Sequence, residues 1–278
     1  MTLARIPLND GTTLPAIGFG TYPLRGEEGI TAMLSALTVG YRLLDSAVNY
    51  RNEEEVGEAL RRSEVARDDV VVATKVPGRF HGFDDALAAV ADSLVRLGVD
   101  QVDLVLIHWP NPSVGKYREA WQALVQARER GLTRSIGVSN FTEQHLHEII
   151  ADTSVTPVVN QVELHPYFPQ AHMRAVHAEL GIVTQAWSPL AKNAALLSEP
   201  AVVNAARAHD VTPGQVVLRW HHQLGVLPIP MSRSRQHQQD NLAIGGFTLS
   251  AQEMADIEDL GRSDGRRFDG DPRTHEEM

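Results

Sequence analysis

Cysteine is absent from the 278 residues of this chain. Without a thiol the chain cannot form a disulfide framework, a zinc–thiolate site, an iron–sulfur cluster or a cysteine nucleophile. Its chemistry must therefore rest on oxygen and nitrogen groups or on a cofactor that it binds.

Long hydrophobic runs are also lacking. No apolar stretch approaches the roughly 18 residues that a membrane helix needs, and residues 1–7 show no apolar run with a small-residue cleavage site. We therefore expect no membrane partner and no targeting segment, and we expect a cytoplasmic location. The 43% hydrophobic and 22% charged residues are typical of a globular protein with a large core.

Positive charge is in short supply. Lys and Arg total 25 against 35 Asp and Glu, which leaves a net charge of −10. A mean field of this sign repels phosphate backbones, so we expect no nucleic-acid partner.

What the chain does have is an alternation of short apolar runs and longer segments with helical periodicity. The runs are apolar along their length, which is typical of a parallel sheet covered on both faces. Eight such units in about 250 residues predict an α/β fold, a (β/α)₈ TIM barrel. The predicted strands are Ile17–Gly20, Arg42–Asp45, Val70–Lys75, Val102–His108, Ser135–Ser139, Val158–Glu163, Ile182–Trp187 and Leu227–Ile229. The predicted helices include Glu28–Val39, Glu53–Arg62, Asp84–Leu97, Tyr117–Arg130, Glu143–Ala151, Ala171–Leu180 and Pro213–Gln223.

The two ends of the chain fall outside this alternation. Residues Arg5–Leu14 contain an Asp-Gly pair and predict a β-hairpin that plugs the barrel floor. Gly261–Met278 is rich in Gly, Asp, Arg and Pro and predicts a loop or tail over the active-site face. No linker divides the sequence, so we expect residues 1–278 to form a single domain.

Ionisable side chains follow the predicted strands at their carboxyl ends, the end at which barrel enzymes carry their active sites. Asp45, Lys75 and His108 end three successive strands, and Tyr50 follows shortly after Asp45. Each has an ordinary structural explanation by itself, but a carboxylate, an ammonium, a phenol and an imidazole at one barrel end indicate an active site.

Two other site types are poorly supported. Gly18-Phe19-Gly20 begins like a dinucleotide fingerprint, but Pro23 stands where the third glycine belongs. The 12 histidines include no HExxH spacing, and we expect no metal site.

Five segments of the chain contain distinctive motifs: Gly40–Ala47 with Tyr50 and Asn52-Glu53, Leu106–Pro110, Arg134–Phe141, Asn160–Tyr167 and Trp187–Leu190. These motifs resemble the signatures of the aldo-keto reductases, nearly from end to end and in the same order. Within that family the chain is most similar to the bacterial 2,5-diketo-D-gluconate reductases.

The resemblance implies hydride transfer from a reduced nicotinamide to a carbonyl, with Asp45, Tyr50, Lys75 and His108 as the catalytic tetrad. Carbonyl reduction develops negative charge on oxygen, which requires a proton donor within reach, and we expect Tyr50 in that role. An adjacent ammonium should lower the pKa of this phenol, and a carboxylate should keep the ammonium charged. Lys75 and Asp45 fit these two roles, and His108 can donate a hydrogen bond to the substrate carbonyl.

The cofactor residues are carried over in the same way. Ser139, Asn140 and Gln161 are implied to bind the nicotinamide carboxamide, and Trp187 to stack on the ring. Further implied cofactor contacts are Gly20, Thr21, Ser188 and Leu190.

One segment departs from the family pattern. After the last strand, Met231 replaces a lysine expected to pair with the 2′-phosphate of NADP, and His237 replaces an arginine that covers adenine. Methionine donates no hydrogen bond, and imidazole carries little charge at neutral pH. We expect NADP(H) binding with weakened discrimination against NAD(H). The implied contacts in this segment are Ser232, Arg233, Arg235 and His237, with Asp240 and Asn241 near adenine.

The expected substrate is a small polar carbonyl compound, such as a keto-sugar acid or an α-keto aldehyde. Pro77-Gly78 occupies a position that is often aromatic in relatives, which should open the pocket on one side. The residues expected to line the pocket are Tyr22, Val48, Asn49, His108, Trp109 and Asn111, with Trp187 and the tail near Phe268.

Two alternatives stay open at this point. Lys75 at a barrel strand end could form a Schiff base in an aldolase. The chain could also be a nicotinamide-binding subunit without turnover. By resemblance we expect a monomer.

Overall fold

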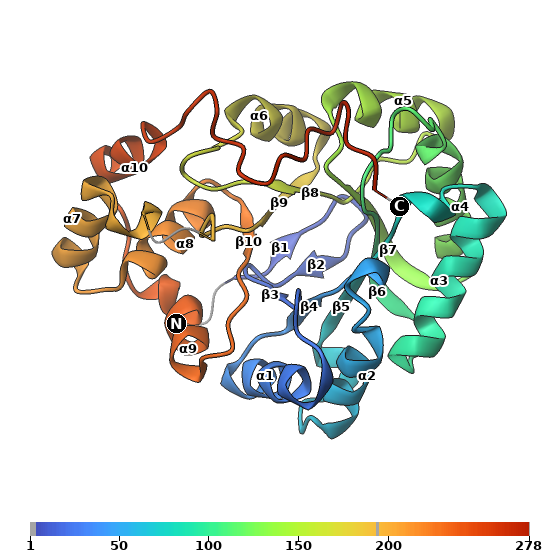
Figure 1. Ribbon diagram of the computed structural model, residues 1–278, viewed down its shortest axis with the longest axis horizontal. Helices are drawn as coiled ribbons and strands as arrows, with labels where there is room; N and C mark the ends of the chain where they lie inside the picture. The colour runs from blue at the N-terminus through green and yellow to red at the C-terminus, as the bar shows by residue number, and fades with distance from the viewer. Residues whose placement is uncertain (1–3, 193–194, 278) are drawn as a thin grey trace.

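The computed structural model describes residues 4–192 and 195–277, and its centre is a barrel of parallel strands (Figure 1). Eight strands pair in chain order from β3 to β10, each parallel to the next. The predicted (β/α)₈ barrel is therefore confirmed. The strands are β3 (Phe19–Gly20), β4 (Leu43–Asp45), β5 (Val71–Val76), β6 (Val102–Ile107), β7 (Thr133–Ser139), β8 (Val159–Glu163), β9 (Val183–Trp187) and β10 (Leu227–Ile229).

Backbone hydrogen bonds close the barrel between its first and last strands. The Gly18 and Gly20 N–H groups donate to the carbonyls of Pro228 and Pro230, each at 3.0 Å. In a parallel ladder the bond returning to the Gly18 carbonyl would come from the N–H of residue 230, and proline has none. At this seam, the line along which β3 meets β10, the N–H donors are therefore only those of residues 18 and 20. Strand β3 is also shorter than the predicted strand Ile17–Gly20.

The helices form an outer ring around the strands (Figure 1). All seven predicted helices are present, with ends shifted by a few residues. The helices α7, α9 and α10 lie outside the seven ranges given above: α7 packs beside α8, and α9 has no apolar face by which its sequence could be recognised. The helices are α1 (Gly26–Val39), α2 (Glu53–Arg62), α3 (Phe83–Leu97), α4 (Tyr117–Glu129), α5 (Glu143–Thr153), α6 (Ala171–Leu180), α7 (Pro200–His209), α8 (Pro213–Gln223), α9 (Arg235–Leu242) and α10 (Ala251–Glu258).

The barrel interior is plugged at its amino-terminal end by the predicted hairpin. Strands β1 (Ile6–Pro7) and β2 (Thr13–Leu14) pair antiparallel, and Leu8 and Leu14 pack with strand residues inside the barrel. Ser135 fastens the turn by donating to the Asp10 carboxylate at 2.6 Å. This end of the barrel is thus closed to solutes.

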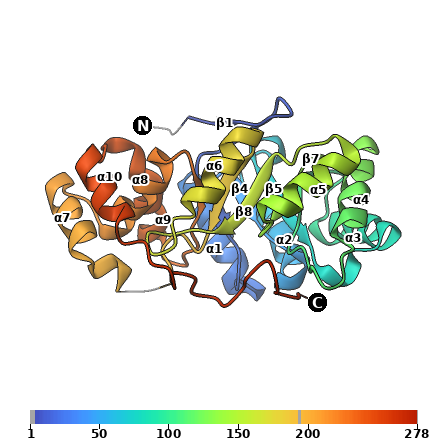
Figure 2. The same cartoon turned by 90° about the horizontal axis from the view of Figure 1, so that it is seen from above.

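The tail after Gly261 runs across the opposite end. Figure 2 shows it on the side of the barrel away from the hairpin. Its Arg262 N–H donates to the Tyr167 carbonyl at 3.0 Å, and its Arg267 N–H donates to the Glu163 carboxylate at 2.7 Å. The predicted tail over the carboxyl ends of the strands is present through Glu277, and Met278 lies outside the described residues.

The structure contains no helix, among residues 4–192 and 195–277, that is both long and apolar enough to span a membrane.

The contact between α2 and α3 depends on a missing side chain. A Cβ added to Gly57 would lie 2.3 Å from the carbonyl oxygen of Leu97, closer than real Cβ contacts come. We expect Gly57→Ala to lower the free energy of unfolding by about 1–3 kcal/mol, measured by urea denaturation. The matched control is Gly214→Ala in α8, where the nearest atom is 3.9 Å away; equal losses in the two variants would refute this explanation.

Candidate active site

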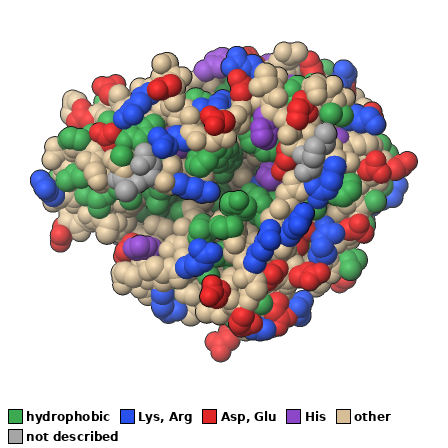
Figure 3. Space-filling model, in the orientation of Figure 1, with side chains coloured by type: hydrophobic (Ala, Val, Ile, Leu, Met, Phe, Trp, Pro, Cys, Tyr) green, Lys and Arg blue, Asp and Glu red, His purple; other side chains and the backbone are tan. Residues whose placement is uncertain are grey.

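A cavity of about 510 Å³ opens at the carboxyl ends of the barrel strands. It appears as a hollow near the middle of the face in Figure 3, with apolar side chains around it. The predicted site residues on its walls are Gly20, Thr21, Tyr22, Asp45, Tyr50, His108, Trp109, Ser139, Asn140, Gln161, Trp187, Ser188 and Leu190. Lys192, Met231 and Phe268 line it as well.

A buried ion pair lies below this cavity. Lys75 on β5 is fully buried, and its Nζ lies 2.7 Å from Oδ2 of Asp45 at the end of β4. The same ammonium donates to the Ser46 carbonyl at 2.8 Å and to the Tyr50 hydroxyl at 3.4 Å. All three N–H groups of the ammonium thus have an oxygen partner.

The pKa values of this cluster differ in part from the expectation. Burial alone would lower the pKa of Lys75, but the Asp45 carboxylate and the Tyr50 oxygen outweigh burial and raise it. Loss of hydration raises the pKa of Tyr50, and the Lys75 ammonium offsets only part of that rise. The expected lowering of the pKa of this phenol is therefore wrong for this structure, because burial outweighs the effect of the Lys75 ammonium and the Asp45 carboxylate adds to the rise. Tyr50 keeps its proton at neutral pH.

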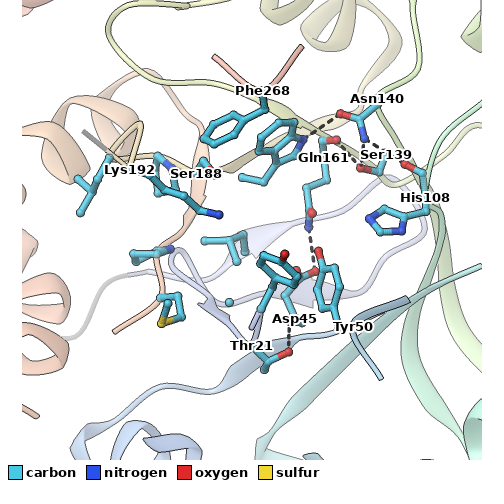
Figure 4. A pocket seen from close by; sticks show the side chains of 18 of the residues that line it. Thr21, Asp45, Tyr50, His108, Ser139, Asn140, Gln161, Ser188, Lys192 and Phe268 are labelled. Carbon is cyan, nitrogen blue, oxygen red and sulfur yellow. Dashed lines mark hydrogen bonds between the residues drawn. The ribbon is translucent and has the colours of Figure 1, made fainter. Parts of the chain in front are cut away.

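The fourth predicted member, His108, follows β6 and faces Tyr50 across the cavity (Figure 4). The two ring centroids are 5.7 Å apart, and the ring planes are inclined at 75°. The Nδ1 atom of His108 lies 2.8 Å from a carboxylate oxygen of Glu277 in the tail. The structure therefore brings Asp45, Tyr50, Lys75 and His108 together, as their placement on successive strands predicts.

Amide side chains form a hydrogen-bonded network beside these four residues (Figure 4). Gln161 donates to Oδ1 of Asp45 at 2.8 Å and to Gln185 at 3.0 Å. Asn140, held at φ 62°, donates to the Ser139 hydroxyl and to the His108 carbonyl, each at 3.0 Å. Trp187 donates from its indole to Asn140 at 2.8 Å. The predicted nicotinamide residues are thus fixed by one another and by the ion pair.

The segment that departs from the family pattern leads from β10 into α9. Met231 is half-buried, packs against the hydrophobic core and contributes to the cavity wall. Arg233, Arg235 and His237 are exposed. The Ser234 hydroxyl caps α9 by accepting from the His237 N–H.

The last three predicted cofactor residues differ in accessibility. Ser232 is half-buried and accepts a hydrogen bond from the Ser234 N–H at 3.0 Å. Asp240 accepts from Gln236 at 2.8 Å, and Asn241 is buried beside Tyr41.

The predicted substrate residues fall into two groups. Tyr22 and Trp109 line the cavity, and the Tyr22 ring lies 5.1 Å from that of Tyr50. Val48 and Asn49 lie on a short 3₁₀ turn, Val48–Tyr50, and Asn111 is fully buried. Asn49 and Asn111 both bind Glu277 of the tail instead of facing an open pocket.

The opening expected beside Pro77-Gly78 is absent, which corrects that prediction. A Cβ on Gly78 would lie 2.2 Å from the Glu277 carbonyl oxygen and 2.1 Å from the Asn111 amide nitrogen. The space left by the missing aromatic residue is filled by the tail.

Sequence reasoning missed Lys192 and Glu277. The Lys192 Nζ lies 5.1 Å from the centroid of the Tyr22 ring and 5.4 Å from that of Phe268. Nothing local marks Glu277, because an acidic residue near the end of a polar tail is typical of a solvated segment.

Among the described residues no group of three or more His, Asp or Glu side chains could hold a metal ion.

The comparison with protein families decides the assignment. The model described as "Aldo/keto reductase family" matches residues 16–262. This chain belongs to the aldo/keto reductase family. That membership makes it an oxidoreductase that acts on carbonyl groups of small molecules.

Individual relatives of this aldo-keto reductase match over nearly the full length. One is 2,5-diketo-D-gluconic acid reductase B from Corynebacterium sp. (strain SHS752001), 56% identical over 98% of each chain. Another is an aldo-keto reductase from Mycolicibacterium vanbaalenii, 48% identical over 96% of this chain and 95% of the relative.

Solved structures agree with the fold. The apo form of Gox0644 has a TM-score of 0.95 and 40% identity over 99% of this chain and 100% of its own. A mutant of Gox0644 in complex with NADPH has a TM-score of 0.94 and 39% identity over the same shares. An aldo-keto reductase from Bombyx mori in complex with NADP has a TM-score of 0.87 and 32% identity over 94% of each chain.

The buried ion pair generates a stability prediction. Asp45→Asn leaves the Lys75 ammonium buried without its counter-charge, which typically costs about 3–5 kcal/mol. We expect a loss of this size in urea denaturation at pH 7. The double variant Asp45→Asn with Lys75→Met removes both charges and should recover most of that loss; a double variant no more stable than Asp45→Asn contradicts the assignment of the loss to the unpaired charge.

Proposed function

We propose that this aldo-keto reductase catalyses the NADP(H)-dependent reduction of aldehyde and ketone groups in small polar carbonyl compounds, with Tyr50 as the proton donor. The observation that carries the proposal is the position of the Tyr50 hydroxyl. Tyr50 lines the cavity, and its hydroxyl lies 3.4 Å from the buried Lys75 ammonium. NADPH, when bound, supplies the hydride that adds to the carbonyl carbon.

The proton transfer follows from the cluster below the cavity. As negative charge develops on the carbonyl oxygen, Tyr50 donates its proton to that oxygen. The raised pKa of Tyr50 keeps the proton in place until then. Lys75 stabilises the phenolate that remains, and Asp45 keeps Lys75 charged. His108, across the cavity, donates a hydrogen bond that orients the substrate carbonyl.

The polar network suits a nicotinamide. Ser139, Asn140 and Gln161 would hold the carboxamide, and Trp187 would stack on the ring. The hydrogen-bonded network supports this assignment, because it holds amides, a hydroxyl and an indole on one wall of the cavity. Gly20, Thr21, Ser188 and Leu190 complete the cofactor contacts on the same cavity walls.

The exposed cations after β10 suit the cofactor's 2′-phosphate. Arg233 and Arg235 would take over the role of the missing lysine, with Ser232 as a further donor and His237 toward adenine. Asp240 and Asn241 would contact adenine at the end of the same segment. Because Met231 contributes no charge, the preference for NADPH over NADH should be modest.

The substrate proposal rests on the aromatic walls and on one relative. Tyr22, Trp109, Trp187 and Phe268 surround the cavity mouth and leave room for a small molecule. The relative named 2,5-diketo-D-gluconic acid reductase B covers nearly the whole chain. We therefore propose keto-sugar acids and α-keto aldehydes as substrates. We also propose that the chain is a single domain and acts as a monomer.

A Schiff-base aldolase is disfavoured. Such a lysine needs a lowered pKa and a free electron pair. Here the pKa of Lys75 is raised, and its three N–H groups contact Asp45, Ser46 and Tyr50.

Removing the Tyr50 hydroxyl tests the chemistry. Tyr50→Phe should lower kcat for every accepted carbonyl substrate by at least about a hundredfold, because the proton donor is lost. NADPH binding, followed by quenching of protein fluorescence, should be retained. The control is Tyr22→Phe, which removes the hydroxyl of the neighbouring cavity tyrosine. Undiminished turnover by Tyr50→Phe rules out the proposed donor, and a wild type that binds NADPH without turnover indicates a non-catalytic subunit.

The cofactor segment makes a separate prediction. Combined Arg233→Ala and Arg235→Ala substitutions should lower kcat/KM for NADPH by about ten- to a hundredfold, the value of one or more charge-assisted hydrogen bonds. The value for NADH should barely change, since NADH lacks the 2′-phosphate. Gln239→Ala on the exposed face of α9 is the control. An equal loss of kcat/KM for NADPH and NADH would show that these arginines do not bind the 2′-phosphate.

A further inference from the structure

The end of the tail is held at the cavity mouth by paired hydrogen bonds. Asn111 accepts from the Glu277 N–H at 3.2 Å through its Oδ1, and its Nδ2 donates to the Glu277 carbonyl. Asn111 is fully buried and held at φ 48°. A buried amide that pairs with both main-chain groups of one residue fixes the position of that residue.

Neighbouring contacts reinforce this position. Gly78 has no side chain at the point where the Glu277 backbone passes. The Ser113 N–H donates to a carboxylate oxygen of Glu276 at 2.8 Å, and the rings of Trp109 and His275 lie 4.2 Å apart. The contacts come from the two loops that follow β5 and β6 and converge on residues 275–277, so this position of the tail is built into the fold.

The fixed backbone directs the Glu277 side chain at the reaction site. One carboxylate oxygen lies 2.8 Å from His108 Nδ1 and 2.7 Å from the Asn49 amide nitrogen. The side chain is 15% exposed. Burial would raise the pKa of this carboxyl, but its contacts with His108 and Asn49 lower it below the ordinary value. Glu277 is therefore an anion at neutral pH.

We infer that Glu277 is a specificity-determining residue that disfavours substrates with a carboxylate next to the reacting carbonyl. The inference deepens the proposed function and rests on it, because His108 must meet the substrate carbonyl. A carboxylate on the adjacent carbon would come within a few ångströms of the Glu277 carboxylate, which already lies against His108 Nδ1 and the Asn49 amide. At an effective dielectric constant of about 20–40, two like charges at such separations repel enough to change binding by about tenfold or more.

Two cations near the cavity have other partners. Arg79 donates to the Asn49 carbonyl oxygen, the opposite end of the amide that holds Glu277. Lys192 lies over Tyr22 and Phe268, at the other wall of the cavity. A neutral or hydroxylated group beside the carbonyl meets no such penalty, and its hydroxyl could donate to the Glu277 carboxylate.

The test compares pyruvate with pyruvamide, which differ by a carboxylate in place of a carboxamide of nearly the same shape. In Glu277→Gln the ratio of kcat/KM for pyruvate to that for pyruvamide should rise about tenfold over the wild type. Glu277→Lys should raise the ratio further. Glu276→Gln is the matched control, because it removes a neighbouring tail carboxylate that binds Ser113 and not His108; its ratio should stay at the wild-type value.

Each outcome has a distinct meaning. If the ratio is unchanged in Glu277→Gln, for example because kcat/KM falls equally for both substrates, the inference is overturned. Glu277 would then only hold the tail in place. An equal rise in Glu276→Gln also overturns it, since the effect would then belong to overall charge. A wild type that reduces pyruvamide supports the proposed function whatever the ratio does, whereas a wild type that reduces no carbonyl compound removes both.

Discussion

The buried pair of Lys75 and Asp45 is the interaction on which the rest of the site depends. An ammonium with no exposed surface persists only if a charge and hydrogen-bond acceptors replace its water. Asp45, the Ser46 carbonyl and the Tyr50 hydroxyl are those replacements. The pair in turn fixes other groups, because the second oxygen of Asp45 accepts from Gln161. The proposed catalytic and cofactor sides of the cavity thus share one carboxylate.

Around this pair the barrel arranges groups of different chemistry by strand order alone. Strands β4, β5 and β6 carry the carboxylate, the ammonium and the imidazole to one end. The strands β7, β8 and β9 carry Ser139, Gln161 and Trp187 to the same end, with Asn140 directly after β7. The proposed reacting centre and the proposed cofactor wall are therefore adjacent arcs of a single ring, and the tail passes over the ring and contacts His108.

Much of this was accessible from the sequence, and the reasons differ by element. Short runs that are apolar along their length identify buried strands, and helical periodicity identifies amphipathic helices. The barrel and the meeting of Asp45, Tyr50, Lys75 and His108 could therefore be predicted. The polar helix α9 has no such periodicity. The raised pKa of Tyr50 depends first on how deeply the phenol is buried and then on the charges of Lys75 and Asp45 beside it, which spacing does not reveal. The contact of Glu277 with His108 joins residues far apart in the chain, with no regular element to set their distance.

The seam between β3 and β10 has a consequence for local stability. Its two bonds run from Gly18 and Gly20 to the carbonyls of proline residues, with none returning from Pro230. Every other neighbouring pair of strands forms a regular parallel ladder. Local openings follow the sparsest hydrogen bonding, so amide hydrogens along this line should exchange with solvent sooner than those of β5 or β6. Gly20 and Met231 flank the seam on the cavity wall. The part of the barrel that we expect to open locally most often therefore lies beside the proposed cofactor site, where a long ligand has to be admitted and released.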